Sequence, residues 1–147
     1  MSNKTRSKAS FKALRERVGL SQQDVSNAIG VNYKTEKRWE NPNFKYGAPE
    51  DAWEYLEKVA ETQKQQVSYC LGVIAHQVEE YGQEPVCVPI TYYRDQKMYD
   101  EYGRDEGPYG WPNAVSRMVA YELERRGIEY EFRYPTEGAI STKGSNY

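Results

Sequence analysis

The chain has 147 residues, of which 38% are hydrophobic and 29% charged, and a formal net charge of −2. This length allows one hydrophobic core or two small ones. Because no apolar run is long enough to span a membrane and the start lacks the apolar segment of a secretory signal, we expect a cytoplasmic protein with no membrane partner. Two cysteines without CxxC spacing and a single histidine argue against a disulfide framework, a zinc site or any other metal or cofactor.

Positive charge is concentrated at one end of the chain. Residues 1–46 contain ten lysines and arginines against four acids, whereas residues 47–147 contain ten against eighteen. This asymmetry is typical of a polyanion-binding segment joined to an acidic body, although a solvated basic arm would give the same counts.

Three short helices are predicted in the basic segment. The first ends at Gly19, because apolar residues recur at helical spacing through SFKALRERVG. The second begins at a capping box formed by Ser21 and Asp24 and ends at Gly30, which can adopt a positive φ.

The third helix is capped by Asn32 and runs from Tyr33 to about Asn41, where Pro42 ends it. Two helices joined by a short turn containing Gly30 predict a helix-turn-helix.

The outward face of the third helix carries most of the candidate DNA-binding residues. In a helix-turn-helix the second helix lies in the major groove, with its N-terminal residues at base edges. Tyr33 and Lys37 are four residues apart, as are Lys34 and Arg38, so this face is basic and aromatic. Three basic residues on one helix are by themselves usually a solvated surface, and the helix-turn-helix favours contact with guanine edges, thymine methyls or phosphates. The candidate DNA-binding residues are Gln22, Asn32, Tyr33, Lys34, Thr35, Lys37 and Arg38.

Two of these candidates lie at helix starts. Asn32 could bond to adenine if its side chain is not used fully as a cap, and Gln22 with the adjacent backbone N–H groups suits a phosphate. Four basic residues near the start should add sequence-independent attraction: Lys4, Arg6, Lys8 and Lys12.

A long fourth helix is predicted from Glu50 to about Tyr81. The acids Glu50 and Asp51 favour its start, and the first glycine inside it is Gly72. An apolar seam with a spacing of three and four residues could pack on the helix's own domain or pair with a second copy of the chain. The seam consists of Trp53, Leu56, Ala60, Val67, Cys70, Ile74 and Tyr81.

The second half predicts a small α+β unit. PVCVPITYYR favours a strand, at a sheet edge because it contains Pro89, and DQKMYDEYG favours a short helix. After the Gly/Pro loop RDEGPYGWP, Asn113 is predicted to cap a helix that Gly127 ends. IEYEFRY then alternates as a second strand.

LRERVGLSQQDVSNAIGVNYKTEKRWEN resembles the Cro/C1-type (xenobiotic-response-element) helix-turn-helix family, whose members are DNA-binding repressors. The matching features are Leu14-Arg15, Gly19-Leu20-Ser21-Gln22, Val25, Ser26, Ile29, Gly30-Val31 and Trp39-Glu40-Asn41. The small side chain of Ser26 lets the two helices cross closely. The resemblance implies a salt bridge between Arg15 and Glu40 that holds the first helix to the third.

One position departs from that family, which has an apolar side chain where this chain has Glu36. We expect Glu36 to swing to the edge and pair with Lys12 or Arg15, or the third helix to be rotated slightly.

A second resemblance covers more of the chain. RWENPNFKYGAPEDAWEYLEKV and, later, GWPNAVSRMVAYELE are similar to two-domain regulators that include anti-CRISPR-associated repressors. The resemblance implies repression of the operon that encodes the regulator, in some cases with messenger RNA bound as well. It also implies a mainly α fold with a lambda-repressor-like helix-turn-helix bundle in residues 1–64, a long linking helix, and a small α+β dimerisation or partner domain in residues 65–147.

Double-stranded DNA and a second copy of the chain are therefore the expected partners. Two wedges of a dimer would bind an inverted repeat about one helical turn (~34 Å) apart and block polymerase. An enzyme is not expected, because no nucleophile–base order or phosphate-cradling loop is present and adjacent acids such as Glu79-Glu80 point apart on a helix. The alternatives are an antitoxin or protein-partner module, and an RNA-binding translational regulator, since eleven of fourteen tyrosines lie beyond residue 66.

Overall fold

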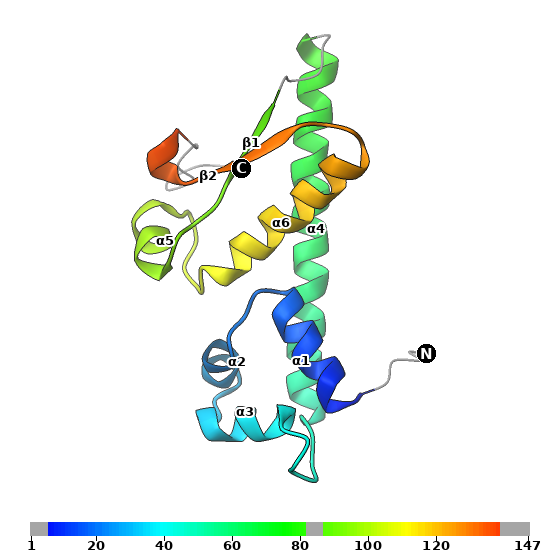
Figure 1. Cartoon of the computed structure of the whole chain (residues 1–147), viewed down its shortest axis with the longest axis vertical. Helices are drawn as coiled ribbons and strands as arrows, with labels where there is room; N and C mark the ends of the chain where they lie inside the picture. The colour runs from blue at the N-terminus through cyan, green and yellow to red at the C-terminus, as the bar shows by residue number, and fades with distance from the viewer. Residues whose placement is uncertain (1–5, 82–86, 139–147) are drawn as a thin grey trace. The chain divides into compact units, whose positions relative to one another are not determined.

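The computed structural model describes residues 6–81 and 87–138 of the chain. Within these ranges the protein is mainly helical and contains one small sheet. The chain divides into two compact units, residues 1–62 and residues 63–147, and one long helix, α4, contributes residues to both (Figure 1). In the described part of the chain, no helix has both the length and the apolar character needed to cross a bilayer.

Unit 1 contains three short helices and the beginning of the long one. The short helices are α1 (Lys8–Arg17), α2 (Gln22–Ile29) and α3 (Tyr33–Glu40), and α4 spans Glu50–Tyr81. They lie beside the first turns of α4 (Figure 1), with α2 packed mainly on α3 and α3 on α1. These boundaries agree closely with the predicted ones.

The helix ends in unit 1 are formed by the side chains predicted for them. The Ser21 hydroxyl accepts from the N–H of Asp24 at 3.0 Å, and the Asp24 carboxylate accepts from the N–H of Ser21 at 2.9 Å, which completes the capping box. Gly30 follows α2 with a φ of 81°, a left-handed conformation that favours glycine. The side-chain oxygen of Asn32 accepts from the N–H of Lys34 at 2.8 Å and caps α3. All three predictions are confirmed.

The core of unit 1 is built around the ring of Phe11. This ring makes edge contacts with Trp39, with centroids 6.0 Å apart, and with Trp53, with centroids 5.2 Å apart. The first part of the predicted α4 seam faces this core, because Trp53, Leu56 and Ala60 are all buried. Apolar burial of Trp39 against Phe11 of α1 therefore helps to hold α3 in place.

Unit 2 contains the rest of α4, two strands and three further helices. These are β1 (Val88–Thr91), α5 (Gln96–Tyr102), α6 (Gly110–Arg125), β2 (Tyr130–Arg133) and the 3-10 helix η1 (Pro135–Glu137). The strands pair in parallel, with each residue of β1 opposite the corresponding residue of β2.

The core of unit 2 lies between the sheet, α6 and the second half of α4. Its buried residues are Val88, Ile90, Val119, Ala120 and Leu123. The seam residues Val67, Cys70 and Ile74 of α4 are partly buried against it. This part of the seam therefore packs on the helix's own unit, which is one of the two predicted alternatives. The side chain of Tyr81 lies outside the described residues.

The predicted cap at Asn113 is wrong, because α6 already begins at Gly110 and includes Asn113 in its first turns. Pro112 is compatible with this earlier start, since proline is tolerated in the first turn of a helix. The side chain of Asn113 instead donates to the carbonyl of Tyr93 at 2.8 Å and accepts from the N–H of Tyr93 at 2.9 Å. It thereby links the segment after β1 to α6.

A close approach also fixes the end of α5. Gly103 follows α5 and donates its N–H to the carbonyl of Tyr99 at 2.7 Å. A Cβ atom at Gly103 would overlap with the buried ring of Tyr99. A glycine is therefore needed at this position for space and not for backbone conformation.

Candidate nucleic-acid interface

The outward face of α3 consists of basic and aromatic side chains. Lys34, Lys37 and Arg38 are exposed, and Tyr33 is 40% exposed. On the other side of α3, Trp39 is buried in the core of unit 1. The helix therefore presents a positively charged surface that is not required for packing.

Two of these cations lie over aromatic rings. The Lys37 ammonium nitrogen is 5.3 Å from the centre of the Tyr33 ring, and the Arg38 guanidinium carbon is 5.4 Å from that of Phe44. Both distances are within the range of a cation–π contact, which at exposed sites is worth about 0.5–1 kcal/mol. Such contacts restrict the side chains and reduce the entropy that binding would cost.

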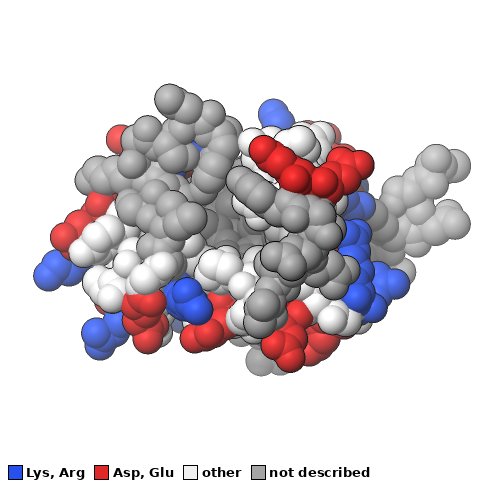
Figure 2. Space-filling model, turned by 90° about the horizontal axis from the view of Figure 1, so that it is seen from above, with Lys and Arg blue, Asp and Glu red and all other residues white. Residues whose placement is uncertain are grey.

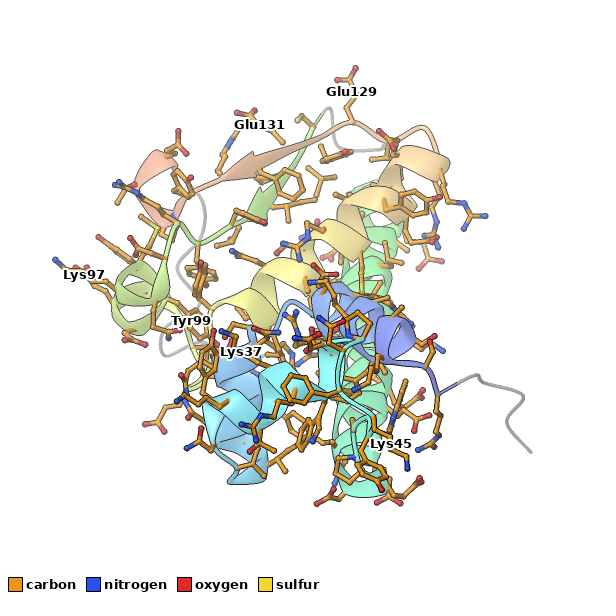
Figure 3. The ribbon with its side chains drawn as sticks, turned by 60° about the horizontal axis from the view of Figure 1, so that its bottom comes forward. Lys37, Lys45, Lys97, Tyr99, Glu129 and Glu131 are labelled. Atoms are coloured by element: carbon orange, nitrogen blue, oxygen red, sulfur yellow. The ribbon has the colours of Figure 1, made fainter. Side chains whose placement is uncertain are left out.

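The loop between α3 and α4 adds side chains that the helical pattern did not indicate. Phe44 is 44% exposed and Tyr46 is 75% exposed, with the Lys45 ammonium 5.4 Å from the Tyr46 ring. Figure 3 shows Lys37 on α3 and Lys45 on this loop, both in the part of the unit that is turned forward. The alternation of aromatic and basic residues in NFKY is the signal that could have identified the loop.

The half-exposed side chain of Lys8 holds this loop against the end of α3. The Lys8 ammonium donates to the carbonyls of Arg38 at 2.9 Å, Trp39 at 3.2 Å and Tyr46 at 2.6 Å. Lysine near a helix C-terminus satisfies carbonyls that have no partner within the helix. Lys8 thus acts inside the unit, and its three donors are used there instead of contributing to general attraction.

The other basic residues near the start are also engaged. Arg6 pairs with Glu50 at 2.6 Å and with Glu57 at 3.3 Å, and Lys12 lies 3.7 Å from Glu16. Lys4 lies outside the described residues. Of the described residues in unit 1, those on α3 and the loop after it form the closest group of exposed cations, namely Lys34, Lys37, Arg38 and Lys45.

Two candidates from the sequence are occupied in other contacts. The oxygen of Asn32 is used as the cap of α3. Gln22 is half-buried and hydrogen-bonds to Glu40, which helps to lower the pKa of that carboxyl. Thr35 is also half-buried. The structure thus brings Tyr33, Lys34, Lys37 and Arg38 together on one surface. The other three candidates, Gln22, Asn32 and Thr35, lie at the margin of this surface or behind it.

A buried ion pair lies behind α3. The Arg15 guanidinium donates to both carboxylate oxygens of Glu40, at 2.8 and 2.9 Å, and to the carbonyl of Leu20 at 2.9 Å. This confirms the pair that the family resemblance implied. Although burial tends to raise the pKa of Glu40, the hydrogen bond and charge of Arg15 lower it overall.

One of the two alternatives expected for Glu36, a swing to the edge, is wrong, because the side chain is completely buried with an exposure of 0%. Its nearest carboxylate oxygen is 3.9 Å from Nε of Arg15, too far for a hydrogen bond. No N–H or O–H group of the described residues donates to either oxygen of Glu36. Burial, together with the neighbouring Glu40, raises the pKa of Glu36 to about 8.

Acidic side chains occur at several separate places on the face seen from above, with lysines and arginines mainly along its outline (Figure 2). In unit 2, the exposed residues Glu129 and Glu131 lie just before β2 and within it (Figure 3). This unit has no run of exposed cations comparable to that on α3 among its described helices and strands.

No family model matches the sequence, and no curated protein is similar to it. The candidate site is therefore defined by the exposed cations of α3 and the loop that follows.

Proposed function

We propose that the protein is a sequence-specific DNA-binding transcriptional regulator. In this proposal α2 and α3 form a helix-turn-helix, with Gly30 as the turn, and α3 enters the major groove of a duplex. The observation that carries the proposal is the outward face of α3. There, three exposed cations and the partly exposed ring of Tyr33 lie together and are not needed for packing within the unit.

The side chains divide into two roles. Lys34, Lys37 and Arg38 reach guanine O6 and N7 or nearby phosphates, while Tyr33 packs on a thymine methyl or a phosphate. Lys45, on the loop whose Phe44 ring lies against Arg38, suits the phosphate backbone at the rim of the groove. Phosphate contacts fix the position of the protein, and base contacts give it sequence preference.

The active form is proposed to be a dimer, because one such wedge makes a small interface and two can bind half-sites about 34 Å apart. Val119 and Leu123 of α6 are buried in the core of unit 2 and are used for packing within the chain. Tyr69 and Val73 of α4 are 54% and 40% exposed and offer an apolar surface to a second copy. A dimer bound over a promoter would repress by blocking polymerase.

Selection of bound duplexes from a random pool, followed by gel-shift assays, tests this function. We expect an inverted repeat to be enriched, and Arg38→Ala to weaken its binding by about 1–3 kcal/mol if the contact is a bidentate one. Arg125→Ala is the matched control, since Arg125 is exposed on α6 of unit 2. Failure to enrich any duplex, or equal losses in both variants, would rule out the proposed interface.

Unpaired RNA is a second candidate ligand, supported by exposed rings beside cations in unit 2. Phe132 is 39% exposed, its ring centre is 5.2 Å from that of Tyr92, and Arg117 donates to the Tyr92 hydroxyl at 2.7 Å. Rings of this kind can stack on unpaired bases. Phe132→Ala should weaken binding of single-stranded RNA without affecting duplex binding if this second function exists.

A further inference from the structure

Glu36 and Glu40 lie one turn apart on the buried side of α3 and share the neighbourhood of one guanidinium. Arg15 is already engaged with both oxygens of Glu40 and with a backbone carbonyl. It therefore has no well-aligned hydrogen bond left for Glu36, which it approaches only to 3.9 Å. Buried carboxyl oxygens without a donor are rare in proteins and call for a specific explanation.

The charges around this pair do not balance if both carboxyls are ionised. From α1, Arg15 and the more distant, half-exposed Lys12 contribute positive charge, and Lys12 is itself paired with Glu16. From α2, Gln22 contributes only a neutral hydrogen bond, to Glu40. An ionised Glu36 would thus be a second buried negative charge beside an existing ion pair, which is strongly unfavourable.

We propose that a proton on Glu36, donated to Glu40, holds α3 in its binding position, and that nucleic-acid affinity falls when this proton is lost at alkaline pH. The inference rests on the proposed function, since it concerns regulation of the same helix. It makes Glu36 a positioning residue that acts through α3 and does not itself touch the ligand.

The protonated form removes the excess negative charge. The O–H of a neutral Glu36 carboxyl donates to Glu40, and Glu40 remains ionised to pair with Arg15. Loss of the proton leaves one uncompensated negative charge, and this charge can be relieved by moving Glu36 toward water. Such a movement turns α3 and displaces Lys34 and Arg38, which are exposed on the side of the helix opposite Glu36. Because burial and Glu40 raise the pKa of Glu36 to about 8, the change falls at mildly alkaline pH.

Linkage requires the reverse effect as well. If a duplex binds the protonated form more tightly, the bound duplex must raise the pKa of Glu36 further. The negative phosphates on the outer face of α3 act in the same direction.

The first test measures duplex affinity from about pH 7 to about pH 9 at constant salt. The wild-type chain should lose up to about tenfold in affinity for each pH unit above the transition, because one proton is involved. Glu36→Gln retains a donor to Glu40 and cannot ionise, so its affinity should stay flat over the same range. Glu54→Gln, on an exposed position of α4, should behave like the wild type. Parallel curves for the wild type and Glu36→Gln would overturn the proposal.

The second test does not depend on binding or on the folding of a variant. Carbon-13 spectra of glutamate-labelled wild-type protein should contain one side-chain signal that titrates near pH 8, with the backbone amides of Lys34 and Arg38 shifting in the same range. A Glu36 signal that titrates near its ordinary pH, or amides that do not follow it, would refute the proposal. If no duplex binds but these signals titrate together, the proposed function fails while the proton-dependent placement of α3 stands.

Discussion

Unit 1 buries a charged cluster behind α3, whereas the buried side chain that links two segments of unit 2 is a neutral amide. Behind α3, the guanidinium of Arg15 faces the carboxyls of Glu36 and Glu40. Between α6 and the end of β1, a single amide, Asn113, exchanges two hydrogen bonds with the backbone of Tyr93. The amide oxygen and nitrogen of Asn113 both have hydrogen-bond partners, whereas the two carboxyl oxygens of Glu36 have none.

This difference shows what each buried group does for its unit. A satisfied amide fixes one segment on another and does not respond to pH. A charged cluster with one carboxyl in excess is stable only while a proton is present, and it lies directly behind the exposed cations of α3. Stability and binding should therefore be coupled in unit 1 and independent in unit 2.

The largest effect should come from Arg15→Leu. This change leaves two carboxyls buried without their cation, and breaking a buried pair in this way typically costs about 3–5 kcal/mol of unfolding free energy. Urea denaturation followed by tryptophan fluorescence would measure the loss, because Trp39 and Trp53 are both buried in unit 1. Arg125→Ala, an exposed arginine of unit 2, should stay within about 0.5 kcal/mol of the wild type. A loss for Arg15→Leu no greater than that would show that the cluster adds nothing to unit 1.

The next effect is the pH dependence of stability caused by Glu36. Its pKa is raised in the folded protein to about 8 from an ordinary value of 4.5, so the folded state binds this proton more tightly than the unfolded state. Stability should therefore be greatest at or below the ordinary value and fall as the pH rises toward 8, by up to about 1.4 kcal/mol for each pH unit. The difference between denaturation curves of the wild type and Glu36→Gln isolates this proton from all others. A constant difference across this range would contradict the assignment.

A smaller effect is expected for Asn113→Ala in unit 2. The change removes two hydrogen bonds to the Tyr93 backbone, each worth about 0.5–1.5 kcal/mol. The loss should be the same at acidic and at neutral pH, in contrast to the behaviour of Glu36. Thermal unfolding at two pH values would measure both the size of the loss and its pH dependence; a loss that changed with pH would remove the contrast between the units.

The smallest effects distinguish two glycines of unit 2. Gly103→Ala places a methyl group against the ring of Tyr99 and should destabilise by about 1–3 kcal/mol. Gly72→Ala, inside α4 and in open space, should stabilise by about 0.5–1 kcal/mol because alanine favours the helix. Chemical denaturation of the two variants side by side gives the signs directly. Equal signs would show that the packing of Gly103 on Tyr99 is not as tight as described.

Local signals in the sequence were sufficient where a helix end depends on its own neighbours. The capping box of Ser21, the left-handed turn at Gly30 and the cap at Asn32 involve residues within a few positions of one another, and all are present. The boundaries of the first four helices follow from these signals. The pair formed by Arg15 and Glu40 came from the family resemblance, since their separation of 25 residues gives no local signal.

Distant contacts account for the predictions that differ from the structure. Asn113 has the composition of a cap, but its partner is Tyr93, 20 residues away, and α6 extends past it to Gly110. Lys8 looked like part of a basic arm, yet it bonds to carbonyls up to 38 residues distant. The burial of Glu36 was missed because a charged residue is expected at a surface unless its partners are known. The basic and aromatic face of α3 followed from helical periodicity, and its role in binding is a proposal.

The salt dependence of duplex binding tests the central claim most directly, which is that the outward face of α3 contacts DNA. Lys37 lies on this face, and Lys97 is an equally exposed lysine on α5 of unit 2 (Figure 3). If Lys37 contacts a phosphate, Lys37→Ala should weaken binding and reduce the slope of affinity against salt by about one ion, whereas Lys97→Ala should leave both unchanged. Identical affinities and identical slopes for the two variants would contradict it.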